Sequence, residues 1–221
     1  MNKLIILDLD GTLVDSLADI HAAASHVASR YGLTEPTSDE VRKMVGDGTR
    51  VLIQRLFGKQ TDDVSLDAPL ACFHEYYAAH ALDRTKPYPG IPEALNGLLS
   101  DGWTLGVLSN KDVQLCLEVI EKMKDFSNMF EFVYGGDSFE NPKPHPDPIL
   151  HICQVTGIPV QRSIMVGDSE NDVRCGQAAG TRTVAVGYGF RDAADLELLN
   201  PDALVSGADE LREAVNRLFR G

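Results

Sequence analysis

The chain has 221 residues, of which 43% are hydrophobic and 24% charged, as is typical of a soluble globular protein with a core of its own. Its 33 acidic and 20 basic side chains give a net charge of −13, so we expect no nucleic-acid partner and no anionic membrane surface. The four cysteines form no Cys-x-x-Cys pair, and no apolar stretch reaches the length of a membrane span or a signal-peptide core, so we predict a cytoplasmic protein.

A short apolar run at residues 4–7 is typical of a buried parallel strand. It leads directly into the sequence Asp8-Leu9-Asp10-Gly11-Thr12, where carboxylates replace the apolar residues. The segment that follows shows only helical patterns. We therefore predict that an all-helical cap, residues 16–83, is inserted into a core formed by residues 1–15 and 84–221.

Two pairs of residues in this insertion have the spacing of a capping box, Ser16 with Asp19 and Thr37 with Glu40. In such a box, each side chain accepts a hydrogen bond from a free backbone N–H at the start of a helix. The proline-rich segment at residues 85–90 is predicted to be the linker that returns the chain to the core.

After residue 87, strand-like and helical segments alternate. The strand-like runs occupy residues 104–108, 132–134, 164–166, 183–186 and 203–205. Strands that alternate with helices form parallel sheets with helices on both faces. The predicted fold is therefore a doubly wound, Rossmann-like α/β sheet that carries the inserted helical cap.

Polar residues follow three of the predicted strands. The first strand ends in Asp8 and Asp10, the second in Ser109-Asn110-Lys111, and the strand at residues 164–166 leads into Asp168. Lys143 lies in the proline-rich loop Asn-Pro-Lys-Pro-His-Pro. Because ligands of open α/β sheets bind at the carboxyl ends of the strands, we expect these side chains to lie together.

Such a set of side chains suits phosphoryl transfer, which requires a nucleophile, positive charge on the phosphoryl oxygens and a proton donor for the leaving group. Of the carboxylates of Asp8 and Asp10, one could point at phosphorus and the other at the leaving group. Carboxylates, including that of Asp168, are ligands that suit Mg²⁺, while Lys143 and Ser109 offer a positive charge and a hydrogen-bond donor. Taken singly, each residue also has a structural explanation, as a turn, a loop cap or a solvated lysine.

Four segments together resemble the haloacid dehalogenase (HAD) superfamily of hydrolases, and most closely its phosphoglycolate phosphatase-like branch with a helical cap after the first motif. The resemblance covers essentially the whole chain and is specific for the superfamily, but much less so for a substrate. The matching segments are Asp8–Ser16, Leu108–Lys111, Pro142–Pro146 and Gly167–Ser169 with Asp172.

The resemblance implies a role for each residue of these segments. Asp8 would be the nucleophile and a Mg²⁺ ligand, and Asp10 would be the general acid and base and would offer its backbone carbonyl to the metal. Asp168 would complete the protein ligands of the metal, and Asp172 would support them. The phosphoryl group would be held by Thr12, Ser109, Asn110 and Lys143.

The acid at position 10 narrows the expected reaction. Members that cleave carbon–halogen bonds or phosphonates lack an acid there, so Asp10 favours a phosphoester, whose leaving group needs a proton. We predict a Mg²⁺-dependent phosphomonoesterase with a phospho-aspartyl intermediate and a small phosphorylated metabolite as substrate, with 2-phosphoglycolate as the first choice. The alternatives are a nucleotide or sugar phosphatase, a pyrophosphatase or a sugar phosphomutase, and, in another class, a non-catalytic phosphoacceptor or binding domain. Monomer and homodimer are both open.

The cap contains a Gly-Asp-Gly-Thr-Arg sequence at residues 46–50, between two predicted helices. In related enzymes a cap loop of this kind reaches the leaving group of the substrate. The glycines permit close approach, and Arg50 could bind a substrate carboxylate through two hydrogen bonds. The alternative is a helix–helix turn with an arginine at the surface.

Overall fold

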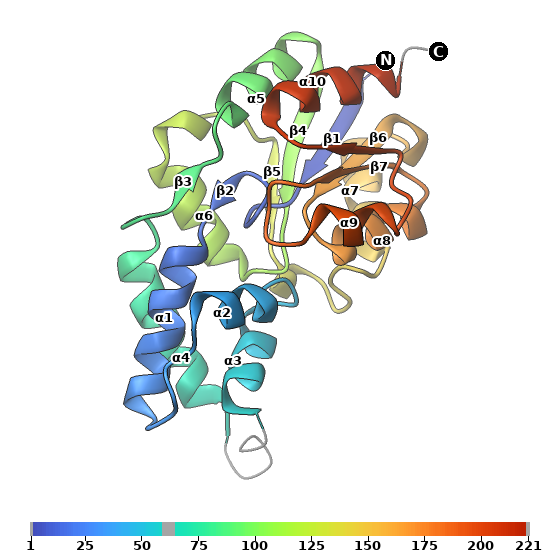
Figure 1. The fold of residues 1–221 in the computed structure, drawn as a ribbon. Helices are drawn as coiled ribbons and strands as arrows, with labels where there is room; N and C mark the ends of the chain where they lie inside the picture. The colour runs from blue at the N-terminus through green and yellow to red at the C-terminus, as the bar shows by residue number, and fades with distance from the viewer. Residues whose placement is uncertain (1, 59–64, 220–221) are drawn as a thin grey trace.

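A six-stranded parallel sheet forms the centre of the larger part of the molecule (Figure 1). The computed structural model describes residues 2–58 and 65–219. The strand order is β5-β4-β1-β6-β7-β8, which places β1 in the middle of the sheet. The strands are β1 (Lys3–Leu7), β4 (Trp103–Leu108), β5 (Phe132–Tyr134), β6 (Ser163–Gly167), β7 (Arg182–Val186) and β8 (Ala203–Val205). The predicted doubly wound sheet is confirmed.

Helices cover both faces of this sheet because the side chains of β1 point alternately to the two sides. Ile5 and Leu7 pack in the core with α5, α6 and α10, whereas Leu4 and Ile6 pack in the core with α7 and α8, and all four side chains are fully buried. The helices are α5 (Ile91–Ser100), α6 (Val113–Lys122), α7 (Asp147–Thr156), α8 (Glu170–Ala179), α9 (Ala193–Glu197) and α10 (Ala208–Arg217), with 3-10 turns η2 (Lys124–Phe126), η3 (Gly136–Ser138) and η4 (Val160–Arg162). No described helix combines the length and the apolar character needed to cross a membrane.

A group of four helices lies beside the sheet and is connected to it by two short strands (Figure 1). The strands β2 (Val14–Asp15) and β3 (Lys86–Pro87) pair antiparallel where the chain leaves the core and returns to it. The predicted linker at residues 85–90 therefore contains a strand. The four helices are α1 (Leu17–Arg30), α2 (Ser38–Met44), α3 (Thr49–Phe57) and α4 (Asp67–His80). This arrangement agrees with an inserted helical cap, and its limits at residues 16 and 83 stay a prediction.

Only one of the two predicted capping boxes forms. At the start of α2, Thr37 Oγ1 accepts a hydrogen bond from the N–H of Glu40 at 3.3 Å, and Glu40 Oε2 accepts one from the N–H of Thr37 at 2.8 Å. The prediction for Ser16 and Asp19 is wrong, because the Ser16 side chain makes no capping bond. Its hydroxyl instead donates to Asp10 Oδ1 at 2.5 Å, so a partner distant in sequence replaces the local one.

Asp19 connects the two chain crossings between cap and core. Its Oδ2 accepts hydrogen bonds from the backbone N–H of Arg84 at 3.0 Å and from the N–H and hydroxyl of Thr85 at 2.8 and 2.7 Å. The side chain is almost completely buried. A buried carboxylate with three donors fixes the start of α1 against the returning chain.

Replacement of Asp19 is therefore expected to destabilise the protein. Asp19→Ala leaves buried N–H and O–H donors unpaired, and we expect the free energy of unfolding to fall by about 3 kcal/mol. Urea denaturation followed by circular dichroism measures this. The control Asp39→Ala, at an exposed position in the first turn of α2, should cost less than about 1 kcal/mol. Equal losses in the two variants would contradict the proposed connection.

Candidate active site

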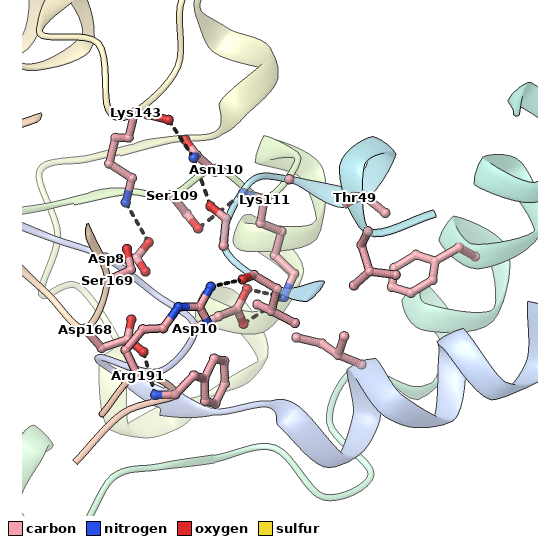
Figure 2. A pocket seen from close by; sticks show the side chains of 17 residues that line it. Asp8, Asp10, Thr49, Ser109, Asn110, Lys111, Lys143, Asp168, Ser169 and Arg191 are labelled. Atoms are coloured by element: carbon pink, nitrogen blue, oxygen red, sulfur yellow. Dashed lines mark hydrogen bonds and ion pairs between the residues drawn. The ribbon is translucent and has the colours of Figure 1, made fainter. Parts of the chain in front are cut away.

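A cavity of about 50 Å³ lies where the cap meets the carboxyl ends of the strands (Figure 2). It has room for only a few groups the size of a water molecule. Its core side is polar and its cap side largely apolar. The core contributes Asp8, Asp10, Ser109, Asn110, Lys111, Lys143, Asp168, Ser169, Phe190 and Arg191, and the cap contributes Ile20, Val45, Gly46, Gly48, Thr49, Leu52 and Phe73.

Asp8 and Asp172 share one buried ammonium group. Lys143 Nζ donates to Asp8 Oδ1 at 2.9 Å, to Asp172 Oδ1 at 2.6 Å and to the carbonyl of Leu108 at 2.7 Å (Figure 2 shows the bond to Asp8). Burial alone would lower the pKa of Lys143, but the neighbouring carboxylates, that of Asp172 most, raise it above its ordinary value. Lys143 is therefore a permanent positive charge beside Asp8.

Three buried carboxylates lie close together at this point. Oxygen atoms of Asp8, Asp168 and Asp172 lie within 4.8 Å of one another. Burial raises the pKa of Asp8 to about 6, although Lys143 lowers it, and burial together with the charges of Asp8 and Asp172 raises the pKa of Asp168 well above its ordinary value. Three carboxylates this close together form a set of hard, negatively charged oxygen donors that fits a divalent cation such as Mg²⁺.

The backbone around the carboxylates is packed so closely that glycine is required. Gly11 has a φ of +84°, and a Cβ atom there would lie 2.2 Å from Asp168 Oδ2. The same carboxylate oxygen accepts a hydrogen bond from the N–H of Phe190 at 2.6 Å. The glycine of the first motif therefore lets the ends of β1 and β6 approach each other.

Asp10 has partners that the sequence did not indicate. In addition to the Ser16 hydroxyl, both Asp10 oxygens accept hydrogen bonds from Lys111 Nζ at 2.8 Å. Lys111 Nζ also donates to the hydroxyl of Tyr77, on cap helix α4, at 2.7 Å. The only sequence signal for Lys111 was its place directly after Ser109 and Asn110, and nothing in the sequence connected Tyr77 to it.

The four predicted phosphate-binding residues differ in whether they line the cavity and in whether their polar groups already have hydrogen-bond partners. Ser109 and Lys143 are buried and line the cavity. Asn110 also lines it, but its side-chain N–H groups are bonded to the carbonyls of Gly46 at 3.0 Å and Lys143 at 2.9 Å. Thr12 is completely buried and is absent from the lining, and its hydroxyl has no hydrogen-bond partner among the described residues.

Core side chains hold the cap loop from which Gly46 and Gly48 face the cavity. The Gly46 carbonyl accepts hydrogen bonds from Nδ2 of both Asn110 and Asn171, at 3.0 and 3.1 Å. Arg191 Nη2 donates to the Val45 carbonyl at 2.6 Å. A Cβ atom on Gly48 would lie 2.9 Å from the Asn110 carbonyl, so the expected close approach of this loop is present, but its neighbour is core backbone.

The structure does not bring Arg50 to the cavity. Its guanidinium donates to Asp67 Oδ1 at 3.0 Å, and 56% of its side chain is exposed. Thr49 and Leu52, three residues apart on α3, lie on the face that lines the cavity. Arg50 is turned by about 100° from Thr49 around the helix and so faces solvent.

The parallel sheet, the helical insertion and the buried carboxylates at the strand ends together form a Rossmann-like α/β fold with a helical cap. The model of the haloacid dehalogenase-like hydrolase family matches residues 5–186, and the chain belongs to this family. The family predicted from the four sequence motifs is therefore confirmed.

The matches to similar proteins cover nearly the whole chain. A protein of Agrobacterium fabrum named phosphoglycolate phosphatase is 36% identical, with 97% of this chain and 93% of that protein covered. A protein of the same name from Aquifex aeolicus is 33% identical over 94% of this chain and 97% of its own length. A crystal structure of a predicted phosphoglycolate phosphatase from Haemophilus somnus superposes with a TM-score of 0.88 at 27% identity, with 96% and 97% of the two chains covered.

The carboxylate cluster predicts how stability depends on pH. Because the pKa of Asp8 is raised from 3.8 to about 6 on folding, the folded chain retains a proton that the unfolded chain loses as the pH rises through this range. In EDTA, we expect stability to decrease between about pH 4 and pH 7 by on the order of 2 kcal/mol from this group. Mg²⁺ should therefore raise the melting temperature more at pH 7.5 than at pH 5.

Thermal denaturation with EDTA or Mg²⁺ at the two pH values is the measurement. Asp8→Asn is the control, because a neutral amide removes the proton uptake and should flatten the decrease. A melting temperature in EDTA that changes with pH equally in both proteins would contradict the assignment.

The orientation of α3 predicts different effects of two substitutions on this helix. Leu52→Trp places a larger side chain in a small cavity, and we expect it to raise the KM for a small phosphomonoester at least about tenfold. Arg50→Ala alters a solvent-exposed side chain and should leave the KM within about twofold. Steady-state kinetics on both variants tests this, and a large increase for Arg50→Ala would place that arginine at the substrate after all.

Proposed function

We propose that this chain is a Mg²⁺-dependent phosphomonoesterase that forms a phospho-aspartyl intermediate on Asp8. The observation that carries the proposal is the position of the Asp8 carboxylate, buried at the cavity and bonded to Lys143 beside the carboxylates of Asp168 and Asp172. Membership of the hydrolase family and the names of the relatives support it.

The contacts of Asp8 suit a nucleophile. Lys143 holds Oδ1, which fixes the orientation of the carboxylate, and its positive charge stabilises the ionised form that attacks phosphorus. The new P–O bond forms on Asp8 as the bond from phosphorus to the leaving oxygen breaks. Lys143 and the hydroxyl of Ser109 face the same cavity and can attract the phosphoryl oxygens.

Asp10 is the second carboxyl group that the reaction needs. It gives a proton to the leaving oxygen in the first step and takes one from the attacking water in the second, which releases phosphate and restores Asp8. The hydroxyl of Ser16 and the ammonium of Lys111 hold Asp10 at the cavity. Both partners therefore position this side chain.

The acidic cluster is where a metal ion would be held. Asp8 and Asp168 offer carboxylate ligands, the backbone carbonyl of Asp10 is the third proposed protein ligand, and Asp172 supports the group. When bound, Mg²⁺ supplies positive charge that offsets the carboxylates and the phosphoryl oxygens.

The size of the cavity favours a short substrate, and we propose 2-phosphoglycolate. A space of about 50 Å³ closed by Ile20, Leu52 and Phe73 suits a leaving group of a few atoms better than a nucleoside. The names of the relatives point to the same compound. A sugar phosphatase, a pyrophosphatase and a phosphomutase of the same fold are the alternatives. We place the enzyme in the cytoplasm, as a monomer or homodimer.

The nucleophile is tested by one substitution. Asp8→Asn removes the attacking carboxylate with little change in volume, so Mg²⁺-dependent hydrolysis of 2-phosphoglycolate and of p-nitrophenyl phosphate should fall at least about 10³-fold. Phosphate release measures both reactions. The control Asp195→Asn, at an exposed position on α9, should retain full activity. Undiminished activity of Asp8→Asn would exclude the phospho-aspartyl route.

A further inference from the structure

Lys111 is a buried cation of the cavity to which the proposed phosphoryl chemistry gives no role beyond positioning Asp10. Its ammonium group lies 2.8 Å from both carboxylate oxygens of Asp10 and 2.7 Å from the hydroxyl of Tyr77, and 4.4 Å from the centre of the Tyr77 ring. Only 8% of Lys111 is exposed. Figure 2 shows its side chain extending past Ser109 toward Asp10, on the side of the cavity that faces the cap.

The two other cations of the lining have partners that hold them in place. Lys143 is bonded to Asp8 and Asp172. Arg191 donates to Glu170 Oε2 at 3.3 Å and to carbonyl groups of the cap. Among the lining residues that the structure describes, Lys111 is therefore the cation placed next to the acid that serves the leaving group.

The ion pair with Lys111 opposes the proposed role of Asp10 as the acid that protonates the leaving oxygen. Both oxygens of Asp10 are occupied by Lys111, and Oδ1 also by Ser16. A leaving oxygen that hydrogen-bonds to Asp10 competes with Lys111 for the same carboxyl group and weakens its contact with the ammonium. The ammonium group is then left with Tyr77, a neutral partner because burial raises the pKa of its hydroxyl to about 12.

A buried ammonium group without a counter-charge is costly, so productive binding is favoured when the substrate brings a negative charge to Lys111. Among the described residues, those that line the cap side of the cavity are apolar or uncharged and offer no competing anion. Thr49, the hydroxyl-bearing residue of that side, already donates to Asp112 at 2.6 Å. A leaving group with an anionic end can therefore replace Asp10 as the partner of Lys111.

We propose that Lys111 is a specificity-determining residue that binds a carboxylate on the leaving group of the substrate. The substrate class is the phosphomonoesters of short hydroxy acids, which place a carboxylate a few atoms from the scissile P–O bond. This inference rests on the proposed phosphatase function. It assigns to a core lysine the role that the sequence had suggested for Arg50 on the cap.

The test compares two esters that differ in one group. In 2-hydroxyethyl phosphate, a neutral CH₂OH replaces the carboxylate of 2-phosphoglycolate. We expect the wild-type chain to have a higher kcat/KM for 2-phosphoglycolate, and Lys111→Met to reduce this preference about 30-fold or more, mainly through KM. Lys111→Arg, which keeps the charge, should retain more of the preference than Lys111→Met. Lys122→Met, at an exposed lysine on α6, is the matched control and should not change it.

The outcomes separate the two roles of Lys111. If it only positions Asp10, Lys111→Met lowers kcat for both esters by the same factor and leaves their ratio unchanged, which would overturn the proposal. If the wild-type chain hydrolyses neither ester, the proposed function fails, and this inference fails with it.

A second measurement uses the unmodified chain and does not depend on the folding of a variant. Hydrolysis of p-nitrophenyl phosphate is inhibited with 3-phosphonopropionate, which carries the carboxylate, or with 3-hydroxypropylphosphonate, which does not. We expect the carboxylate to lower the inhibition constant at least about tenfold. Equal inhibition by the two compounds would overturn the proposal.

Discussion

The balance of charge at the end of the central strand is the constraint on which the rest of the site depends. The parallel sheet places the carboxylates of Asp8, Asp168 and Asp172 close together, away from water, with Lys143 as the nearest cation. Burial raises the pKa of Asp8, and the charges of Asp172 and Asp10 add to this effect against the opposing charge of Lys143. A divalent cation and a phosphoryl group that carries its own negative charge are the ligands that such a set of charges can receive together.

The cap residues described in the lining add apolar side chains and glycine backbone but no charged side chain. The contribution of the cap to the lining is apolar except for Thr49 and two glycines, and the polar contacts across the boundary come largely from core side chains. The core therefore supplies both the chemistry and most of the electrostatic recognition. We propose that the cap limits the size of the ligand and excludes water, and the exclusion of water strengthens interactions between charges inside the cavity.

Much of the fold and of the candidate site could be predicted from the sequence because the patterns that indicate them lie in short, contiguous segments. The strand at residues 4–7 and the carboxylates after it are contiguous, and the position of β1 in the middle of the sheet then determines where Asp8 lies. Partners distant in sequence could not be predicted this way. Ser16 has the spacing of a helix cap, but its hydroxyl donates to Asp10. Lys111, in the core, donates to the hydroxyl of Tyr77 on cap helix α4. These contacts depend on how the cap rests on the sheet, which no local pattern encodes.

The amide group of Asn110 has a consequence for the timing of the reaction. Its two N–H groups join the carbonyl of Gly46, on the cap, to the carbonyl of Lys143, in the core. An outward movement of the cap loop would break the bond to Gly46 and leave the bond to the Lys143 carbonyl in place. We infer that the Asn110 amide makes both hydrogen bonds only while the cap loop lies against the core. In the proposed phospho-aspartyl route, the closed cavity must still hold the water molecule that hydrolyses the acyl phosphate.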